Sequence, residues 1–269
     1  MTRWPYAWLF ALFVAPIPVF AEELSLLTTS GGDVGVQVFG HTYDADRDGA
    51  FDLSTASKKI GITGSFSQSL GDGWYWGADG RYAWGATSFS SAARGSNSGN
   101  AESLLEVRVT AGRDFDAGTQ VLSPYTGLGY RAIYSNLKAY TDTGYVSPTR
   151  NGNLVYLPVG LTHRLRLASD SRLATTLEGD YLLAGTQQTR YTDIVGYTSD
   201  LSVSQRRGYG ARLNIAYETA AWSAGVFYHY WNIAESEPGT YANTSTVFTA
   251  TEAHNITREI GVHVKFRFN

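Results

Sequence analysis

Cysteine is absent from the 269 residues of this chain. Its absence excludes a disulfide framework, a thiolate metal site, a cysteine nucleophile and a lipid-modified N-terminal cysteine. The formal net charge is only −3, so the chain also lacks the bulk positive charge that attracts nucleic acid, and we expect no nucleic-acid partner. Without covalent crosslinks, stability must come from backbone pairing and packing.

Beyond its first residues the chain has no apolar run of the roughly 20 residues that a spanning helix needs, which excludes a helical membrane protein. Residues 1–21 are typical of an export signal, in which Arg3 is the positive start, residues 8–14 are apolar, and residues 19–21 form a processing site. Pro16 and Pro18 interrupt the run and argue against an anchor. We expect residues 22–269 to form one mature domain.

The chain is rich in glycine, with 29 residues, and 14% of it is aromatic, a mixture that suits many strands and turns. Its last residues, 259–268, alternate polar or small side chains with apolar ones. A strand repeats every two residues, so this segment has one apolar and one charged face. The apolar face meets either the core of a soluble sandwich or the lipid around a barrel.

The same period predicts ten strands near residues 33–43, 57–69, 74–87, 103–115, 120–135, 154–167, 172–190, 208–217, 221–232 and 257–268. Tight turns at 70–73, 116–119, 168–171 and 218–220 alternate with long polar segments at 44–56, 88–102, 136–153, 191–207 and 233–256. This alternation favours a closed, antiparallel, up-and-down transmembrane β-barrel over a sandwich, with eight to twelve strands as the range.

Aromatic residues gather near the predicted strand ends, as in the two girdles of a membrane barrel. The turn end carries Trp74, Trp76, Tyr217, Trp222 and Phe268, and the loop end carries Trp84, Tyr134, Tyr191 and Tyr230. Ordinary core aromatics of a soluble β protein would leave this placement unexplained.

With these features the chain resembles the small bacterial outer-membrane β-barrel superfamily, which includes porin-like and opacity-like proteins. Its last strand is similar to the signal that the barrel assembly machinery reads, which Glu259, Gly261, Val264 and Phe266 would supply here. Many members end on the aromatic residue, whereas this chain ends Phe268-Asn269. The resemblance implies a monomer in the Gram-negative outer membrane, in contact with lipid and lipopolysaccharide, and no particular activity.

Charged residues occupy the other face of the predicted strands, and they must line the lumen because each Arg or Lys facing hydrocarbon would cost about 2 to 4 kcal/mol at the midplane. Two pairs on neighbouring strands, Asp79 with Arg108 and Arg81 with Glu106, have the same sum of residue numbers, so one antiparallel register satisfies both. The inward set is Lys59, Asp79, Arg81, Glu106, Arg108, Arg131, Arg164, Arg166, Glu178, Asp180, Arg212, His229, Glu259, His263, Lys265 and Arg267.

The first long polar segment carries a partial calcium-loop pattern. The twelfth position is Thr55, where such a loop needs Glu, so the alternative is a solvated acidic loop without a cation. Candidate ligands at positions one, three, five and nine are Asp44, Asp46, Asp48 and Asp52. No other cofactor is expected.

Three functions remain open at this stage. A small barrel is mostly filled by side chains, which favours a structural or adhesive protein whose Ser-, Thr-, Asn- and Tyr-rich loops contact a host or surface ligand. Alternatively, the cationic excess predicts a narrow, porin-like diffusion channel with slight anion preference. The least favoured function is a rim-sited hydrolase: the Asp-His motif of omptin proteases is missing, and His229 opposite Glu259 could be a dyad or a plain lumen histidine.

Overall fold

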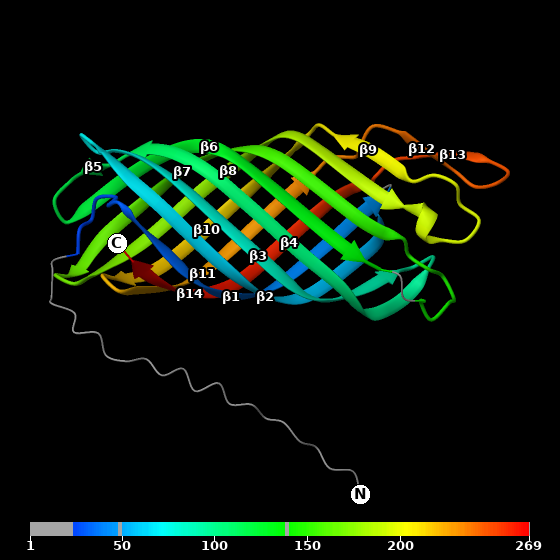
Figure 1. Cartoon of the computed structure of the whole chain (residues 1–269), viewed down its shortest axis with the longest axis horizontal. Helices are drawn as coiled ribbons and strands as arrows, with labels where there is room; N and C mark the ends of the chain where they lie inside the picture. Colours follow the sequence, from blue (N-terminus) through cyan, green and yellow to red (C-terminus); the bar gives the residue numbers. More distant parts are fainter. Residues whose placement is uncertain (1–23, 48–49, 138–139, 269) are drawn as a thin grey trace, which may run out of the picture.

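The computed structural model describes residues 24–47, 50–137 and 140–268. The predicted export signal at residues 1–21 therefore lies outside the described residues. Among those described, no helix has the length and apolar character of a transmembrane helix. Most of the described chain is β-strand (Figure 1).

Ten long strands form one closed antiparallel barrel, as predicted. Each pairs with its neighbour in the chain, and the circle closes where β14 pairs with β1. Smaller strands β5 (Phe115–Asp116), β9 (Leu201–Gln205), β12 (Gly239–Ala242) and β13 (Val247–Ala250) lie at the ends. The barrel strands are β1 (Gly31–Arg47), β2 (Ala50–Gly71), β3 (Trp74–Ser91), β4 (Gly95–Arg113), β6 (Gln120–Asn136), β7 (Thr149–Ala168), β8 (Ser171–Arg190), β10 (Gly208–Thr219), β11 (Trp222–Ile233) and β14 (His254–Phe268).

The two ends of the barrel differ, as the loop lengths predict. Tight turns join β2 to β3, β7 to β8 and β10 to β11 at one end, where the C-terminus also lies (Figure 1). The opposite end carries β9, β12, β13 and the short 3-10 helix η1 (Tyr191–Asp193). In bacterial barrels of this topology the turns face the periplasm and the loops face outside. We call the two ends the turn end and the outer end.

Two predicted loops are wrong. Segments 44–56 and 88–102 are mostly strand, because β1 and β2 stay paired to Arg47 and Ala50, and β3 and β4 to Ser91 and Gly95. These stretches lack apolar alternation, yet their β-branched, hydroxyl and aromatic side chains still suit a pleated ladder. Inward positions Thr55, Ser57, Thr87 and Phe89 are buried although they lie beyond the apolar band.

The outer surface of the strands is apolar. Val36, Ile62, Val107, Val159 and Val262 are each about half exposed although nothing in the described chain covers them. A continuous exposed apolar belt of this kind is expected of a surface that meets lipid. Most girdle aromatics also lie outward, but Tyr191 was wrongly assigned, since it stacks among the outer loops.

Candidate functional site

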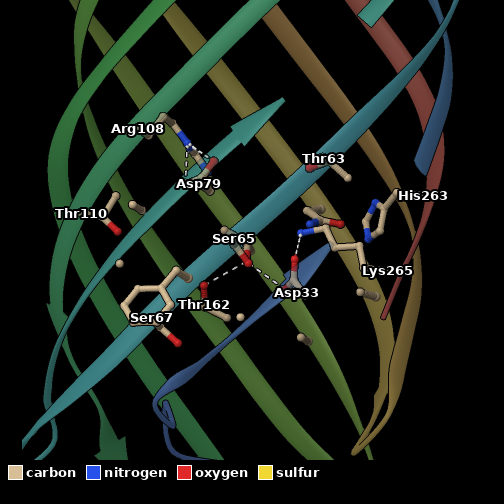
Figure 2. Close-up of a pocket in the computed structure, with 18 of the residues that line it drawn as sticks. Asp33, Thr63, Ser65, Ser67, Asp79, Arg108, Thr110, Thr162, His263 and Lys265 are labelled. Atoms are coloured by element: carbon tan, nitrogen blue, oxygen red, sulfur yellow. Dashed lines mark hydrogen bonds and ion pairs between the residues drawn. The ribbon is translucent and has the colours of Figure 1, made fainter. Parts of the chain in front are cut away.

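The lumen has three layers along the barrel axis, and the first is a polar cavity of about 370 Å³ at the turn end. Figure 2 shows its hydroxyl-rich wall, with Thr63, Ser65, Ser67 and Thr110. Lys265 Nζ lies 3.2 Å from Asp33 Oδ1, so that wall is locally neutral. We call this space the inner cavity.

Residues 24–30 lie at the turn end, where Thr28 and Thr29 line the inner cavity. Three lumen arginines bind carbonyls of this segment: Arg164 donates to Leu26 at 3.5 Å, Arg166 to Leu24 at 3.0 Å, and Arg172 to Ser25. Leu24 and Leu26 are buried. The N-terminal segment therefore lies against the lumen at the turn end before β1 begins. Arg164 and Arg166, which the sequence predicts in the lumen, bind the backbone of this segment.

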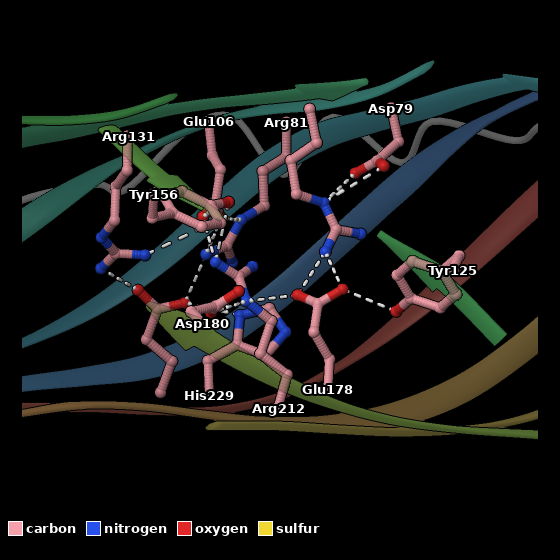
Figure 3. A network of polar contacts seen from close by, with 12 residues as sticks. Asp79, Arg81, Glu106, Tyr125, Arg131, Tyr156, Glu178, Asp180, Arg212 and His229 are labelled. Atoms are coloured by element: carbon pink, nitrogen blue, oxygen red, sulfur yellow. Dashed lines mark hydrogen bonds and ion pairs between the residues drawn. The ribbon is translucent and has the colours of Figure 1, made fainter. Parts of the chain in front are cut away.

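The second layer is a network of buried charges that crosses the lumen, which we call the plug (Figure 3). On the strand pair β3–β4 the register is the predicted one, with Asp79 opposite Arg108 and Arg81 opposite Glu106. Arg108 Nε donates to Asp79 Oδ1 at 2.9 Å, and Arg81 Nε donates to Glu106 Oε2 at 2.7 Å. The plug comprises Asp79, Arg81, Glu106, Arg108, Arg131, Tyr156, Glu178, Asp180, Arg212 and Glu259.

Glu106 is the hub of the plug. Besides Arg81, it accepts hydrogen bonds from Arg212 Nη2 at 2.5 Å and from the Tyr156 hydroxyl at 2.8 Å. Arg212 also donates to Asp180 Oδ2 at 2.7 Å. These contacts link β4 to β7 and β10, strands that are not its neighbours, so they cross the lumen.

A second carboxylate, Glu259 on β14, joins the other side of the plug. It lies 2.6 Å from Arg131 Nη2 and 2.8 Å from Arg81 Nη2. Further along, Glu178 accepts from Arg108 at 2.6 Å and from the Tyr125 hydroxyl at 2.6 Å. A charge taken out of water is costly unless it is paired and hydrogen-bonded, and the sharing of each carboxylate among several donors meets that condition.

His229 does lie opposite Glu259, as the last hairpin predicts. Its Nδ1 is 3.4 Å from Glu259 Oε2, while that carboxylate is already held by Arg81 and Arg131. An engaged carboxylate is a poor partner for proton transfer, so the geometry agrees better with a lumen histidine than with a dyad.

The third layer is a smaller cavity of about 80 Å³, the outer cavity, between the plug and the outer end. One wall is apolar: Leu154, Trp231 and Ile233 line it, and they pack with Tyr156 and Leu182 in one cluster inside the barrel. The opposite wall is polar: Glu102 accepts from Lys59 and, at 2.6 Å, from the Ser135 hydroxyl, and lies 3.3 Å from His41 Nδ1. Sequence reasoning missed this cavity because it assigned apolar side chains to the lipid face.

At the outer end three side chains meet across the lumen. Arg150 of β7 and Tyr43 of β1 both bind Glu252, which precedes β14, and Arg150 donates to the Tyr43 hydroxyl at 3.2 Å. Glu252 is held in turn by its backbone N–H, which donates to Ser236 Oγ at 2.8 Å. This group of Tyr43, Arg150 and Glu252 borders the outer cavity, since Tyr43 and Arg150 line that cavity.

The predicted calcium ligands do not form a loop in the described residues. Asp44 and Asp46 lie on the extended strand β1, and Asp44 Oδ2 pairs with Arg258 at 2.9 Å. Asp48 lies outside the described residues, and the side chain of Asp52 is not described. Within the described part of the chain no group of three or more carboxylates or histidines could hold a metal. Calcium binding stays a prediction.

The residues of the predicted assembly signal all lie on β14. Glu259 faces the plug, while Val264 and Phe266 are exposed on the lipid face. A Cβ atom at Gly261 would lie 2.4 Å from Phe39 Cβ and 2.7 Å from Phe227 Cζ, so only glycine fits there. Recognition by the assembly machinery stays a prediction.

Aromatic rings from two of the outer loops pack together. The rings of Tyr191 and Tyr241 stack at 4.0 Å and 9°, and Tyr197 and Phe248 stack against Tyr241. The backbone N–H of Thr198 donates to the Ala242 carbonyl at 2.8 Å, which joins the two loops directly. We call this group the aromatic cap.

The closed antiparallel barrel, its apolar belt and its polar lumen together decide the type of fold. The fold is that of a bacterial outer-membrane β-barrel. No protein-family model matches the sequence, and no curated protein is significantly similar to it.

Solved structures are similar in fold at low sequence identity. The outer membrane protease OmpT from Escherichia coli matches with a TM-score of 0.60 and 12% identity, over 93% of this chain and 100% of that one. The transport unit of the autotransporter AIDA-I from Escherichia coli (TM-score 0.48, 10% identity) covers 88% of this chain and 90% of its own. A TodX monoaromatic hydrocarbon channel mutant (TM-score 0.36, 10% identity) covers 90% and 91%. At such identities the likeness concerns the fold alone.

Proposed function

We propose that this protein is a closed outer-membrane barrel that acts through its outer loops in surface contact, such as adhesion to a host or surface ligand. The observation that carries the proposal is the plug. Glu106 and Glu259 are almost fully buried and bind arginines from strands on several sides of the lumen. A water-filled path would have to break several of these pairs at once.

The outer loops support the second half of the proposal. The aromatic cap gives them a fixed shape, and Tyr140, Val195 and Val247 remain strongly exposed on the loops around it. Tyr beside small polar residues supplies contact area at low conformational cost. A rigid scaffold with preorganised loops is the arrangement expected of a binding protein.

Two measurements test this function. Reconstituted protein should give no discrete conductance steps in planar lipid bilayers. Bacteria that display the barrel should lose adherence to a host-cell layer when residues 239–250, which include β12 and β13, are replaced by a short turn. Heat-modifiable migration on a denaturing gel checks that the shortened barrel still folds. Adherence that is unchanged by the replacement would contradict the proposal.

The alternative is a narrow diffusion channel. It is favoured by the two cavities on either side of the plug. Regular conductance steps with a reversal potential displaced toward the chloride equilibrium would establish this alternative. A rim-sited hydrolase has only the fold shared with OmpT in its favour, and fold alone carries no activity.

A further inference from the structure

The outer cavity combines an apolar wall with buried donors that lack an acceptor. The Trp231 indole Nε1–H and Arg131 Nη1 both belong to residues that are 1% exposed and that line this cavity. Within the described part of the chain neither atom has a hydrogen-bond partner. Arg131 Nη1 lies 3.8 Å from Glu106 Oε2, which is too long for a hydrogen bond.

Unpartnered buried donors are costly, and folded proteins normally satisfy them by protein, water or ligand. His41, which lines the same space, is 2% exposed and its Nε2 is likewise unpartnered among the described residues. Three nitrogen-bearing side chains from β1, β6 and β11 thus border one cavity. Two of the three atoms can only donate, so the missing group is an acceptor.

The apolar wall defines the other half of the ligand. Ile133, Leu137, Leu154 and Ile233 line the cavity together with the Trp231 ring. The volume of about 80 Å³ is roughly half that of a cavity that holds benzene, which is about 150 Å³. Since benzene has six carbons, a ligand of about three to four non-hydrogen atoms suits this space.

We propose that the outer cavity binds a carboxylate of the size of acetate, with one small apolar group. The carboxylate oxygens would accept from Trp231 Nε1 and from Arg131 Nη1, while Arg131 Nη2 binds Glu259. Arginine suits this role because its planar fork of donors can bind two carboxylates at once. The methyl group lies against the leucines and isoleucines of the apolar wall. This site goes beyond surface contact and does not depend on it.

The test is binding of ¹³C-labelled acetate to the wild-type barrel in lipid nanodiscs, followed by carbon NMR. A saturable exchange-broadened signal is expected. Gly152→Val should weaken binding more than tenfold, because Gly152 lines the cavity and a Cβ there would meet only the flexible end of Gln187. Trp231→Phe should weaken it about fivefold, the loss of one hydrogen bond.

The matched control is Gly179→Val, since Gly179 is exposed on β8 and a Cβ there meets nothing within 4 Å. It should bind like the wild type. If Gly152→Val does not fold, as judged by heat-modifiable migration, Gly152→Ala takes its place. Binding that Gly152→Val and Gly179→Val affect equally would overturn the site.

The ligand class is tested separately by competition of acetamide and of ethylamine with the labelled acetate. The amide should bind more weakly than the carboxylate, and the ammonium should not compete. Tighter binding of the ammonium would overturn the proposal. Because these readouts do not involve adherence or conductance, failure of the ligand site and failure of the proposed function are distinguishable.

Discussion

Replacing the hub of the plug should destabilise the barrel strongly. Glu106→Gln keeps the shape of the side chain and removes its charge. Arg81 then keeps Glu259 at 2.8 Å and Arg212 keeps Asp180 at 2.7 Å, so neither guanidinium is left without a carboxylate. Breaking a buried pair costs about 3 to 5 kcal/mol, and the remaining partners place this variant near the lower value, roughly 3 kcal/mol.

The assay is guanidinium unfolding of the barrel in lipid vesicles, with tryptophan fluorescence and heat-modifiable migration as two probes. A loss of about 3 kcal/mol lowers the folding equilibrium constant roughly 150-fold. The matched control is Glu237→Gln, whose partner Arg206 lies 3.3 Å away with both side chains more than half exposed. Exposed pairs contribute about 0 to 1 kcal/mol. Equal effects of the two substitutions would refute the argument that the plug is a buried, interdependent network.

Three further perturbations follow from other layers of the structure. Val107→Arg puts a cation on the lipid face and should lower the free energy of unfolding by about 2 to 4 kcal/mol, measured in the same assay. Gly129→Val should cost about 1 to 3 kcal/mol there, because a Cβ atom would lie 2.2 Å from Tyr156 Cζ. At the outer end, the Ser96 backbone N–H and hydroxyl donate to Asp142 and lower the pKa of its carboxyl. That contact should be fully present above the ordinary pKa of Asp and be lost as the pH falls through the lowered pKa of Asp142. Hydrogen exchange at the Ser96 amide should then lose its protection in acid, and Asp142→Asn should not show this pH dependence.

The strands and the register of β3 with β4 could be predicted because each strand faces two environments, lipid on one side and the lumen on the other. Lipid selects apolar side chains at every second position, and the lumen accepts charges between them. On β3 and β4 those charges are complementary, so Asp79 and Arg81 fix the same register against Arg108 and Glu106. Local alternation is enough to predict such neighbouring contacts.

The contacts across the lumen could not be predicted in this way. Arg212 reaches Glu106 over 106 positions of the chain, and Arg131 reaches Glu259 over 128. Whether two inward side chains meet depends on the diameter, tilt and stagger of the closed barrel, and none of these appears in the pattern of one strand. The sequence therefore predicted a charged lumen and not the plug that those charges form.

The outer cavity was missed for a different reason, although the sequence carries a signal for it. Trp231 and Ile233 lie two and four residues after the inward His229, so strict alternation places both side chains in the lumen. Lipid cannot explain an apolar side chain on that face. Such a residue must be covered by other lumen side chains, as the Tyr156 ring covers Trp231 at 5.1 Å, or by a bound molecule. Side-chain packing leaves a cavity with unpartnered donors there, so apolar residues at lumen parity indicate where packing inside the barrel is incomplete.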